Sequence, residues 1–229
     1  MPWSRVVVGQ VEQRTPALSE RGGRFIVLEG PDGGGKTTQV ARTLDWLQST
    51  GREVIACRDP GGTALGDHLR VLLKERSDVA IGMTAEMLLF MASRAQLLAE
   101  VVRPALDRGA VVVGDRYLLS NMVYQGVAGG LDVADLWHVG RAATGGLLPD
   151  LTVVVDVPVA VSLDRIGPGR DRIEDRGVLY REQVRRGFLD AVATYPSPIV
   201  VVDGSRPRDE VTRNIQTEVA RALAIDPRA

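Results

Sequence analysis

The residues with the clearest chemical potential lie at positions 30–37, Gly-Pro-Asp-Gly-Gly-Gly-Lys-Thr. They match the pattern G-x-x-x-x-G-K-[ST], in which backbone N–H groups surround phosphate oxygens at the start of a helix. Lys36 can reach the β- and γ-phosphates of a nucleoside triphosphate, and the Thr37 hydroxyl can bind Mg²⁺. The motif therefore predicts a nucleotide site, formed by Gly30, Pro31, Asp32, Gly33, Gly34, Gly35, Lys36, Thr37 and Thr38.

A second promising pair, Asp115 and Arg116, follows the apolar run at 110–115 (AVVVGD). A carboxylate at the end of a buried strand near a phosphate loop can hold Mg²⁺, directly or through water. The alternative is a carboxylate that caps the next helix. Arg116 is better explained by a second phosphate group than by a surface charge, because guanidinium groups match phosphate geometry.

Phe90 and Arg94 lie four residues apart in a helical pattern, so they share one face. An aromatic residue in an apolar helix is usually core, but a buried arginine without a partner is costly. A base that stacks on Phe90, with its edge bonded to Arg94, explains both residues.

Three arginines, Arg165, Arg170 and Arg172, flank the Gly-Pro-Gly segment at 167–169. This composition predicts a mobile lid at about 165–176, whose arginines can close over transferring phosphates. Because acidic residues lie nearby, a solvated charged turn is the alternative.

Apolar runs and helical patterns alternate from residue 24 onward. The runs are continuous and rich in valine and isoleucine, which is typical of parallel strands covered on both faces. We predict strands at 24–29, 53–58, 110–115, 151–157 and 198–203, and helices at 38–49, 63–74, 84–108, 131–144, 178–194 and 208–224. Pro104 is expected to kink the last turn of the third helix, and Gly109 to end it. The pattern predicts an α/β fold, a doubly wound five-stranded parallel sheet with helices on both faces, forming one domain over 24–229.

Composition limits the function. Hydrophobic residues make up 45% of the 229 residues, which is enough for a sizeable core. The 28 basic and 29 acidic side chains give a net charge of −1, so no nucleic-acid partner is expected. A single cysteine, Cys57, excludes an internal disulfide and fits a reducing compartment. No apolar stretch reaches the roughly 18 residues that a membrane helix needs. We expect a cytoplasmic protein with a polar N-terminal extension, residues 1–23, whose order and purpose the sequence does not reveal.

Taken together, the segments resemble the thymidylate kinase family, P-loop nucleoside monophosphate kinases that make dTDP from dTMP and MgATP. The resemblance is co-linear from about Phe25 to the final helix. It is carried by FIVLEGPDGGGKTTQ (25–39), RDPGGT (58–63), LFMASRAQ (89–96), DRYLLSNMVYQG (115–126) and DRIE (171–174). Its most specific part is DRY-x-x-S-N-x-x-Y at a strand end, with the Phe/Arg pair upstream.

The resemblance implies roles at the acceptor nucleotide. Phe90 would stack on the thymine and Arg94 would bond its edge. Asn121 would contact the base, and Tyr124 would pack against the sugar and disfavour a 2′-hydroxyl.

The resemblance also implies how phosphates and metal are held. The acceptor's 5′-phosphate would be bound by Arg70 and Arg116, with Asp32 near the acceptor sugar and the metal. Asp59 is counted among the substrate-binding residues. It stands where many relatives have glutamate, and its shorter side chain is expected to change any metal or water contact at this position. Mg²⁺ would be organised by Thr37, Asp32 and Asp115, and transfer assisted by Lys36, Arg116, Asp115 and the lid arginines Arg165, Arg170 and Arg172. Some members of the family carry a catalytic arginine within the phosphate loop, whereas others supply it from the lid. Gly33 occupies the loop position here, so this sequence resembles the members with a lid arginine.

The implied reaction is in-line transfer of the γ-phosphoryl group of ATP to dTMP, by a protein whose relatives form homodimers. Other readings remain open on the residues alone: a kinase of the same fold that uses dUMP or a deoxynucleoside, and a non-catalytic nucleotide-binding protein. A nucleic-acid-processing ATPase would need a basic surface to bind phosphates. The net charge of −1 gives this interpretation no support.

Overall fold

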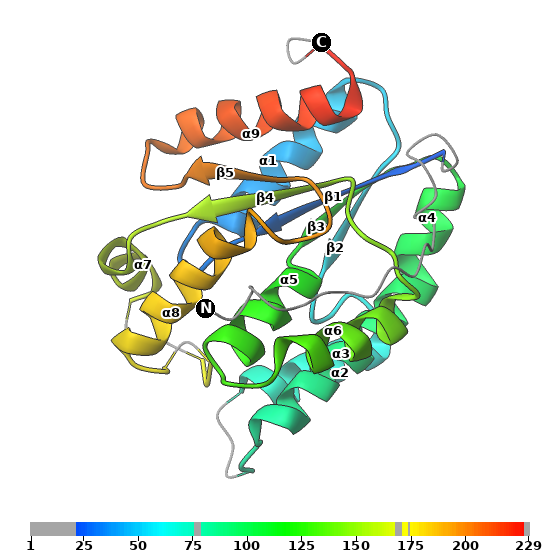
Figure 1. Cartoon of the computed structure of the whole chain (residues 1–229). Helices are drawn as coiled ribbons and strands as arrows, with labels where there is room; N and C mark the ends of the chain where they lie inside the picture. The colour runs from blue at the N-terminus through cyan, green and yellow to red at the C-terminus, as the bar shows by residue number, and fades with distance from the viewer. Residues whose placement is uncertain (1–21, 76–78, 168–170, 174, 227–229) are drawn as a thin grey trace.

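The structure, a computed structural model, describes residues 22–75, 79–167, 171–173 and 175–226. All but the last two residues of the predicted N-terminal extension therefore lie outside the described residues. Five strands form one parallel sheet in the order β2-β3-β1-β4-β5 (Figure 1), which confirms the predicted fold class. The strands are β1 Arg24–Glu29, β2 Val54–Arg58, β3 Val111–Asp115, β4 Leu151–Asp156 and β5 Ile199–Asp203.

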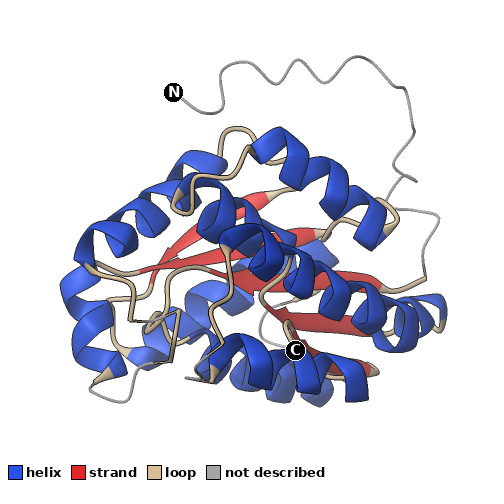
Figure 2. Cartoon of the chain, turned by 90° about the horizontal axis from the view of Figure 1, so that it is seen from below, coloured by secondary structure: helices blue, strands red, loops and turns tan. Residues whose placement is uncertain are grey.

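Helices cover both faces of this sheet, as Figure 2 shows. On one face, α1 Lys36–Ser49 and α9 Arg208–Leu223 pack against each other and against the strands. Side chains that alternate along β1 divide between the two layers: Ile26 and Leu28 join the core under α1 and α9, while Phe25 and Val27 join the other core. Burial on both sides explains why the central strands β1, β3 and β4 are continuously apolar.

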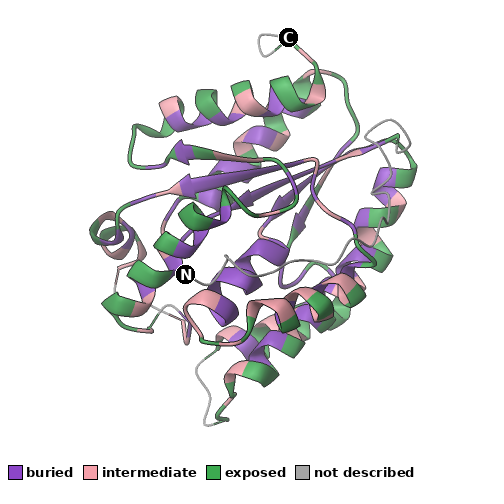
Figure 3. Ribbon diagram, viewed as in Figure 1, coloured by how far each residue is buried: buried purple, intermediate pink, exposed green. Residues whose placement is uncertain are grey.

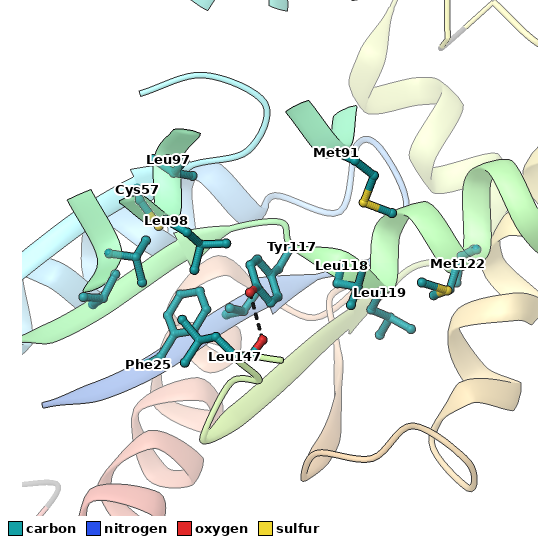
Figure 4. Close-up of a cluster of buried hydrophobic side chains, with 14 of the residues drawn as sticks. Phe25, Cys57, Met91, Leu97, Leu98, Tyr117, Leu118, Leu119, Met122 and Leu147 are labelled. Atoms are coloured by element: carbon teal, nitrogen blue, oxygen red, sulfur yellow. Dashed lines mark hydrogen bonds between the residues drawn. The ribbon is translucent and has the colours of Figure 1, made fainter. Parts of the chain in front are cut away.

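The second face is covered by the helices α3 Met83–Leu97, α4 Arg103–Asp107, α5 Leu118–Asn121 and α6 Val133–Thr144. Figure 4 shows the centre of this core, where the Phe25 and Tyr117 rings meet edge to face at 5.0 Å. The buried Tyr117 hydroxyl donates to the Leu147 carbonyl at 2.9 Å, so its polar end is satisfied. Burial is deepest in the strands and in these inward-facing helix sides (Figure 3).

Three helical segments differ from the sequence-based prediction. The helix expected at 84–108 is interrupted by a π-helical turn, Leu98–Val102, directly before the segment that contains Pro104. This wider turn is a known way to accommodate a residue that cannot donate an N–H. Residues 118–127 were given no helix, yet they form α5 and a second π-helical turn, Met122–Val127. The third is α7 Val159–Ile166, whose last turn contains Arg165.

The remaining helices are α2 Ala64–Lys74, which begins after a side-chain cap from Thr63, and α8 Val178–Ala191. No helix in the described part of the chain is long and apolar enough to cross a membrane. In the sheet, β1 lies between β3 and β4, so the chain turns to opposite sides of β1. Ligands of such sheets bind where this reversal occurs, beyond the carboxyl ends of the strands.

Candidate active site

The phosphate loop connects the end of β1 to the start of α1 and is shaped by close backbone contacts. Gly30 has a φ of 130°, and a Cβ at this position would lie 2.4 Å from the Val155 carbonyl oxygen. Gly33 has a φ of 74°, and its Cβ would lie 2.6 Å from the Ser162 carbonyl oxygen. Any side chain at these positions would therefore force the loop away from β4 and α7.

Lys36 is the first residue of α1 and is buried. In the ligand-free chain its ammonium group donates to the Pro31 carbonyl at 2.7 Å, within the loop itself. Burial, followed by the nearby positive charge of Arg116, lowers the pKa of Lys36 to about 8. A bound phosphate group would add negative charge beside this ammonium group and so favour its protonated form.

Thr37 and Asp115 meet across the loop, because the ends of β1 and β3 are paired in register. The Thr37 hydroxyl donates to Asp115 Oδ2 at 2.7 Å. The next helix, α5, has Tyr117 at its N-cap position, so Asp115 does not cap it. Hydroxyl and carboxylate oxygens are the ligands that Mg²⁺ prefers, and this donor set fits the ion. Within the described ranges, no cluster of three or more acidic, histidine or cysteine side chains forms an alternative metal site.

Arg116 links the phosphate loop to a neighbouring pocket. Its guanidinium group donates to the Gly30 carbonyl at 3.0 Å, pairs with the Asp32 carboxylate and lies over the Tyr124 ring. The Tyr124 hydroxyl donates to Asp32 Oδ2 at 2.8 Å. Arg116 has a φ of 73°, a costly backbone conformation for a residue with a side chain and one that often marks functional sites.

The charges in this cluster fix the ionisation of Asp32. Burial alone would raise its pKa, but the positive charges of Arg116 and Lys36 outweigh burial and hold the pKa below its usual range. Asp32 is therefore a carboxylate at all physiological pH values. It holds Arg116 and Tyr124 in place at the boundary between the loop and the pocket.

A pocket lies beside the loop and is partly open to solvent; the space between its walls, solvent included, is about 440 Å³. Segments that are far apart in the sequence contribute to its wall. The lining residues are Asp32, Asp59, Pro60, Lys74, Phe90, Arg94, Arg116, Ser120, Asn121, Tyr124, Gln125, Asp171 and Ile173. Phe90 and Arg94 of α3 thus reach one pocket, together with Asn121 and Tyr124.

Comparison with known proteins places this arrangement in a family. The family model for thymidylate kinase matches residues 28–215. A thymidylate kinase from Deinococcus radiodurans is 44% identical over 200 residues, covering 86% of this chain and 97% of the relative. The chain belongs to the thymidylate kinase family. It is therefore a phosphotransferase of the nucleotide kinase type.

Two further relatives agree. A thymidylate kinase from Rhodopirellula baltica is 43% identical over 193 residues, covering 84% of this chain and 78% of the relative. The crystal structure of thymidylate kinase from Ehrlichia chaffeensis superposes with a TM-score of 0.70 at 26% identity, covering 86% of this chain and 99% of that one.

In this thymidylate kinase family member, Arg94 is tied to the protein more tightly than the sequence indicates. Its Nε donates to Asp59 Oδ2 at 2.5 Å, and both side chains are almost completely buried. Further donors reach the Tyr117 carbonyl at 3.2 Å and the Met91 sulfur at 3.2 Å. Asp59, expected among the substrate-binding residues, lines the pocket and also fixes Arg94 at its wall.

Within the described part of the chain, the side-chain amide of Asn121 is hydrogen-bonded at only one of its two ends. Its Nδ2 donates to Gln125 Oε1 at 2.9 Å, whereas its buried Oδ1 has no hydrogen-bond partner among the described residues. A buried acceptor without a partner costs roughly 1–3 kcal/mol. Since Asn121 lines the pocket, a ligand N–H is the natural partner for this oxygen.

The predicted arginines have different surroundings. Arg165 donates to the Gly204 carbonyl at 3.0 Å and to Gly33 of the phosphate loop at 3.4 Å. Arg172 instead bonds Glu86 and the Leu73 carbonyl, and Arg70 bonds the Pro60 carbonyl without lining the pocket. Arg170 lies outside the described residues.

Several polar residues at the site were missed by sequence reasoning. Glu29 at the end of β1 is fully buried and accepts from the Tyr117 and Ser120 backbone N–H groups, so it fixes the start of α5. Burial raises the pKa of this carboxyl group, although Arg116 and the hydrogen bonds oppose the rise. Lys74 and Asp171 form an ion pair of 2.7 Å in the pocket wall. Glu29 could have been found from the sequence, because it is a charged residue in an otherwise apolar run, as Arg94 is.

Proposed function

We propose that this protein transfers the γ-phosphoryl group of ATP to the 5′-phosphate of dTMP, giving ADP and dTDP. An acceptor phosphate oxygen forms a bond to the γ-phosphorus, while the bond to the β,γ-bridging oxygen breaks and its electron pair leaves with ADP. The nucleophile is already an anion, so no general base is needed. Family membership and the pocket beside the phosphate loop both support this reaction.

One observation carries the proposal: the phosphate loop and the pocket share a boundary at Asp32 and Arg116. Asp32 belongs to the loop and lines the pocket, and Arg116, which also lines the pocket, bonds Asp32 and the Gly30 carbonyl of the loop. A donor on the loop and an acceptor in the pocket would therefore meet at Arg116. This guanidinium group would offset repulsion between the two phosphate chains and orient them for in-line attack. Asp32 would hold Arg116 in position rather than bind a phosphate itself.

The acceptor base would lie between Phe90 and the polar wall made by Arg94 and Asn121. Thymine presents an N3–H donor, which matches the unpartnered Asn121 oxygen. Arg94, held by Asp59, would use its remaining N–H groups for a base oxygen. Tyr124, which lines the pocket, would pack against the sugar.

Lys36, Thr37 and Asp115 would hold the donor phosphates together with Mg²⁺. The ion, when bound, neutralises negative charge on the β- and γ-phosphates. Thr37 and Asp115 would supply oxygen ligands, directly or through water, and Lys36 would leave the Pro31 carbonyl for the phosphates. Asp32 would lie near the metal as well, with its carboxylate bonded to Arg116 and Tyr124.

Among the predicted lid arginines that the structure describes, Arg165 is the best placed to reach the transferring group. It already contacts the loop at Gly33, whereas Arg172 is held by Glu86. The lack of space at Gly33 supports a catalytic arginine supplied from outside the loop.

A homodimer and a cytoplasmic location complete the proposal. Exposed apolar side chains lie on α2 and α3, two helices that pack together: Leu65, Val71, Leu72 and Leu88. A second copy would cover them. Light scattering should then give twice the chain mass of 24.7 kDa, and a monomer at micromolar concentration would reject this part of the proposal.

The reaction is tested by ADP release from MgATP with dTMP, dUMP, dCMP, dGMP, thymidine or no acceptor. Turnover that depends on dTMP is expected, with weak use of the others and almost none of thymidine, which lacks the phosphate for Arg116. ATP binding without acceptor-stimulated turnover would reject the proposed reaction.

A further inference from the structure

A chain of buried hydrogen bonds runs from Glu86 to the pocket wall. Glu86 lies on α3 and is fully buried. Its Oε1 accepts from Gln125 Nε2 at 2.8 Å, and Gln125 Oε1 accepts in turn from Asn121 Nδ2 at 2.9 Å. The chain ends at Asn121 Oδ1, which has no partner among the described residues.

Two arginines form ion pairs with the carboxylate of Glu86, the first member of this chain. Arg172 Nη2 and Arg176 Nη2 both donate to Glu86 Oε2, at 2.5 and 2.6 Å. The other oxygen, Oε1, is left for Gln125. A carboxylate can accept hydrogen bonds but has no proton to donate.

The direction of the whole chain follows from this restriction. An amide side chain offers N–H donors at one end and a carbonyl acceptor at the other, and it can turn by 180° at little steric cost. Because Glu86 only accepts, Gln125 must turn its NH₂ group toward it. Gln125 then presents oxygen to Asn121, and Asn121 must present oxygen to the pocket.

We infer that Glu86 is a specificity-determining positioning residue, which selects acceptor bases with an N–H donor at N3 by fixing the orientation of the Gln125 and Asn121 amides. This inference rests on the proposed function, in which Asn121 faces the acceptor base. Thymine and uracil carry a hydrogen on N3. Cytosine has a bare N3 acceptor, which the Asn121 oxygen would repel.

A glutamine at position 86 removes the restriction, because its amide can donate. With Glu86→Gln the chain can reverse: residue 86 donates to Gln125 Oε1, Gln125 donates to Asn121 Oδ1, and the Asn121 NH₂ group faces the pocket. The reversed chain suits cytosine. The carbonyl oxygen of the introduced amide would still accept from Arg172 and Arg176, so its NH₂ group would face Gln125 and favour the reversed chain. Discrimination against cytosine therefore weakens.

The test compares kcat/KM for dTMP, dUMP and dCMP in the wild-type protein and in Glu86→Gln. The ratio of dTMP to dCMP should fall by about ten-fold or more, the usual consequence of one buried hydrogen-bond group facing the wrong way. The ratio of dTMP to dUMP should stay within about two-fold, since both bases carry the N3 hydrogen. General damage to the pocket would instead lower use of all three acceptors alike.

Two matched variants separate the amide chain from the ion pairs. Gln125→Met breaks the chain but leaves Glu86 and its arginines intact, so it too should lower the dTMP to dCMP ratio. Arg176→Lys disturbs the ion pairs but keeps the carboxylate, so it should preserve the ratio. If Glu86→Gln does not fold, Gln125→Met decides the question.

The outcomes distinguish this inference from the proposed function. Wild-type preference for dTMP over dCMP, unchanged in both Glu86→Gln and Gln125→Met, would overturn the role of Glu86 and leave the kinase assignment standing. Absence of dTMP-dependent turnover in the wild-type protein would overturn the proposed function, and this inference with it.

Discussion

The two halves of the site are built in different ways. The phosphate side is one contiguous loop, residues 30–37, whose backbone is shaped by glycines packed against β4 and α7. The acceptor side collects side chains from several distant segments, and these are already bonded to one another before a ligand arrives: Arg94 to Asp59, Lys74 to Asp171 and Asn121 to Gln125. Phosphate binding therefore needs few side chains, whereas acceptor choice depends on how side chains orient their neighbours.

The largest effect is expected at the phosphate side, where one side chain carries most of the charge. Lys36→Ala should lower turnover by about 10²–10⁴-fold, because the charge on the transferring group loses its fixed cation. Thermal melting should show an intact fold. Turnover close to wild type would contradict the assignment of the loop.

On the acceptor side, Arg94→Ala should raise KM for dTMP by roughly ten-fold to a hundred-fold and leave KM for ATP within about two-fold. It should also lower the free energy of unfolding by about 3–5 kcal/mol, because the buried Asp59 carboxylate loses its partner. Steady-state kinetics and urea unfolding measure the two effects. Equal increases in the KM values for dTMP and ATP would contradict the claim that Arg94 serves only the acceptor side.

A smaller effect concerns the protonation of the phosphate side. In the ligand-free protein, the Lys36 ammonium group loses its proton as pH rises through its pKa of about 8. Phosphate groups bind the protonated form. Affinity for ATP should thus be constant at lower pH and weaken above about pH 8, by at most ten-fold per pH unit. Calorimetric titrations between pH 7 and 9.5 measure this. Lys36→Arg, which stays charged, is the control, and an identical pH profile in both proteins would exclude Lys36 as the cause.

The smallest effect is expected where an ion pair lies outside both halves. Arg108 and Glu53 are paired at 3.1 Å with about half of each side chain exposed, 54% and 50%. Arg108→Gln should change the free energy of unfolding by less than about 0.5 kcal/mol, since water solvates both charges. A change of 3 kcal/mol, as expected for Arg94→Ala, would show that burial is not what separates the two pairs.

The same contrast explains how much the sequence could predict. The phosphate loop and the five strands are local patterns, so both are visible in contiguous residues. Phe90 and Arg94 were found because their spacing places them on one helix face. Glu86 was missed because its partners Gln125, Arg172 and Arg176 lie 39, 86 and 90 positions away, and no local pattern links them.

The helix at residues 118–127 was missed for similar reasons. Residues 118–127 form a buried α5 and π-helical turn whose start is fixed by Glu29, about 90 positions earlier in the chain. Since nearly all of these side chains are buried, the segment lacks the one-sided apolar pattern that marks a surface helix. The ion pair between Asp59 and Arg94 was missed because the two residues lie 35 positions apart and meet only in three dimensions.

The most direct test of the central claim, that the two halves bring a donor and an acceptor phosphate together, is phosphorus-31 NMR of the products formed from MgATP and dTMP. The account predicts that ADP and dTDP appear in equal amounts, with almost no free phosphate. Accumulation of orthophosphate in place of dTDP would mean that water, and not the acceptor in the pocket, receives the γ-phosphoryl group, and it would contradict the account.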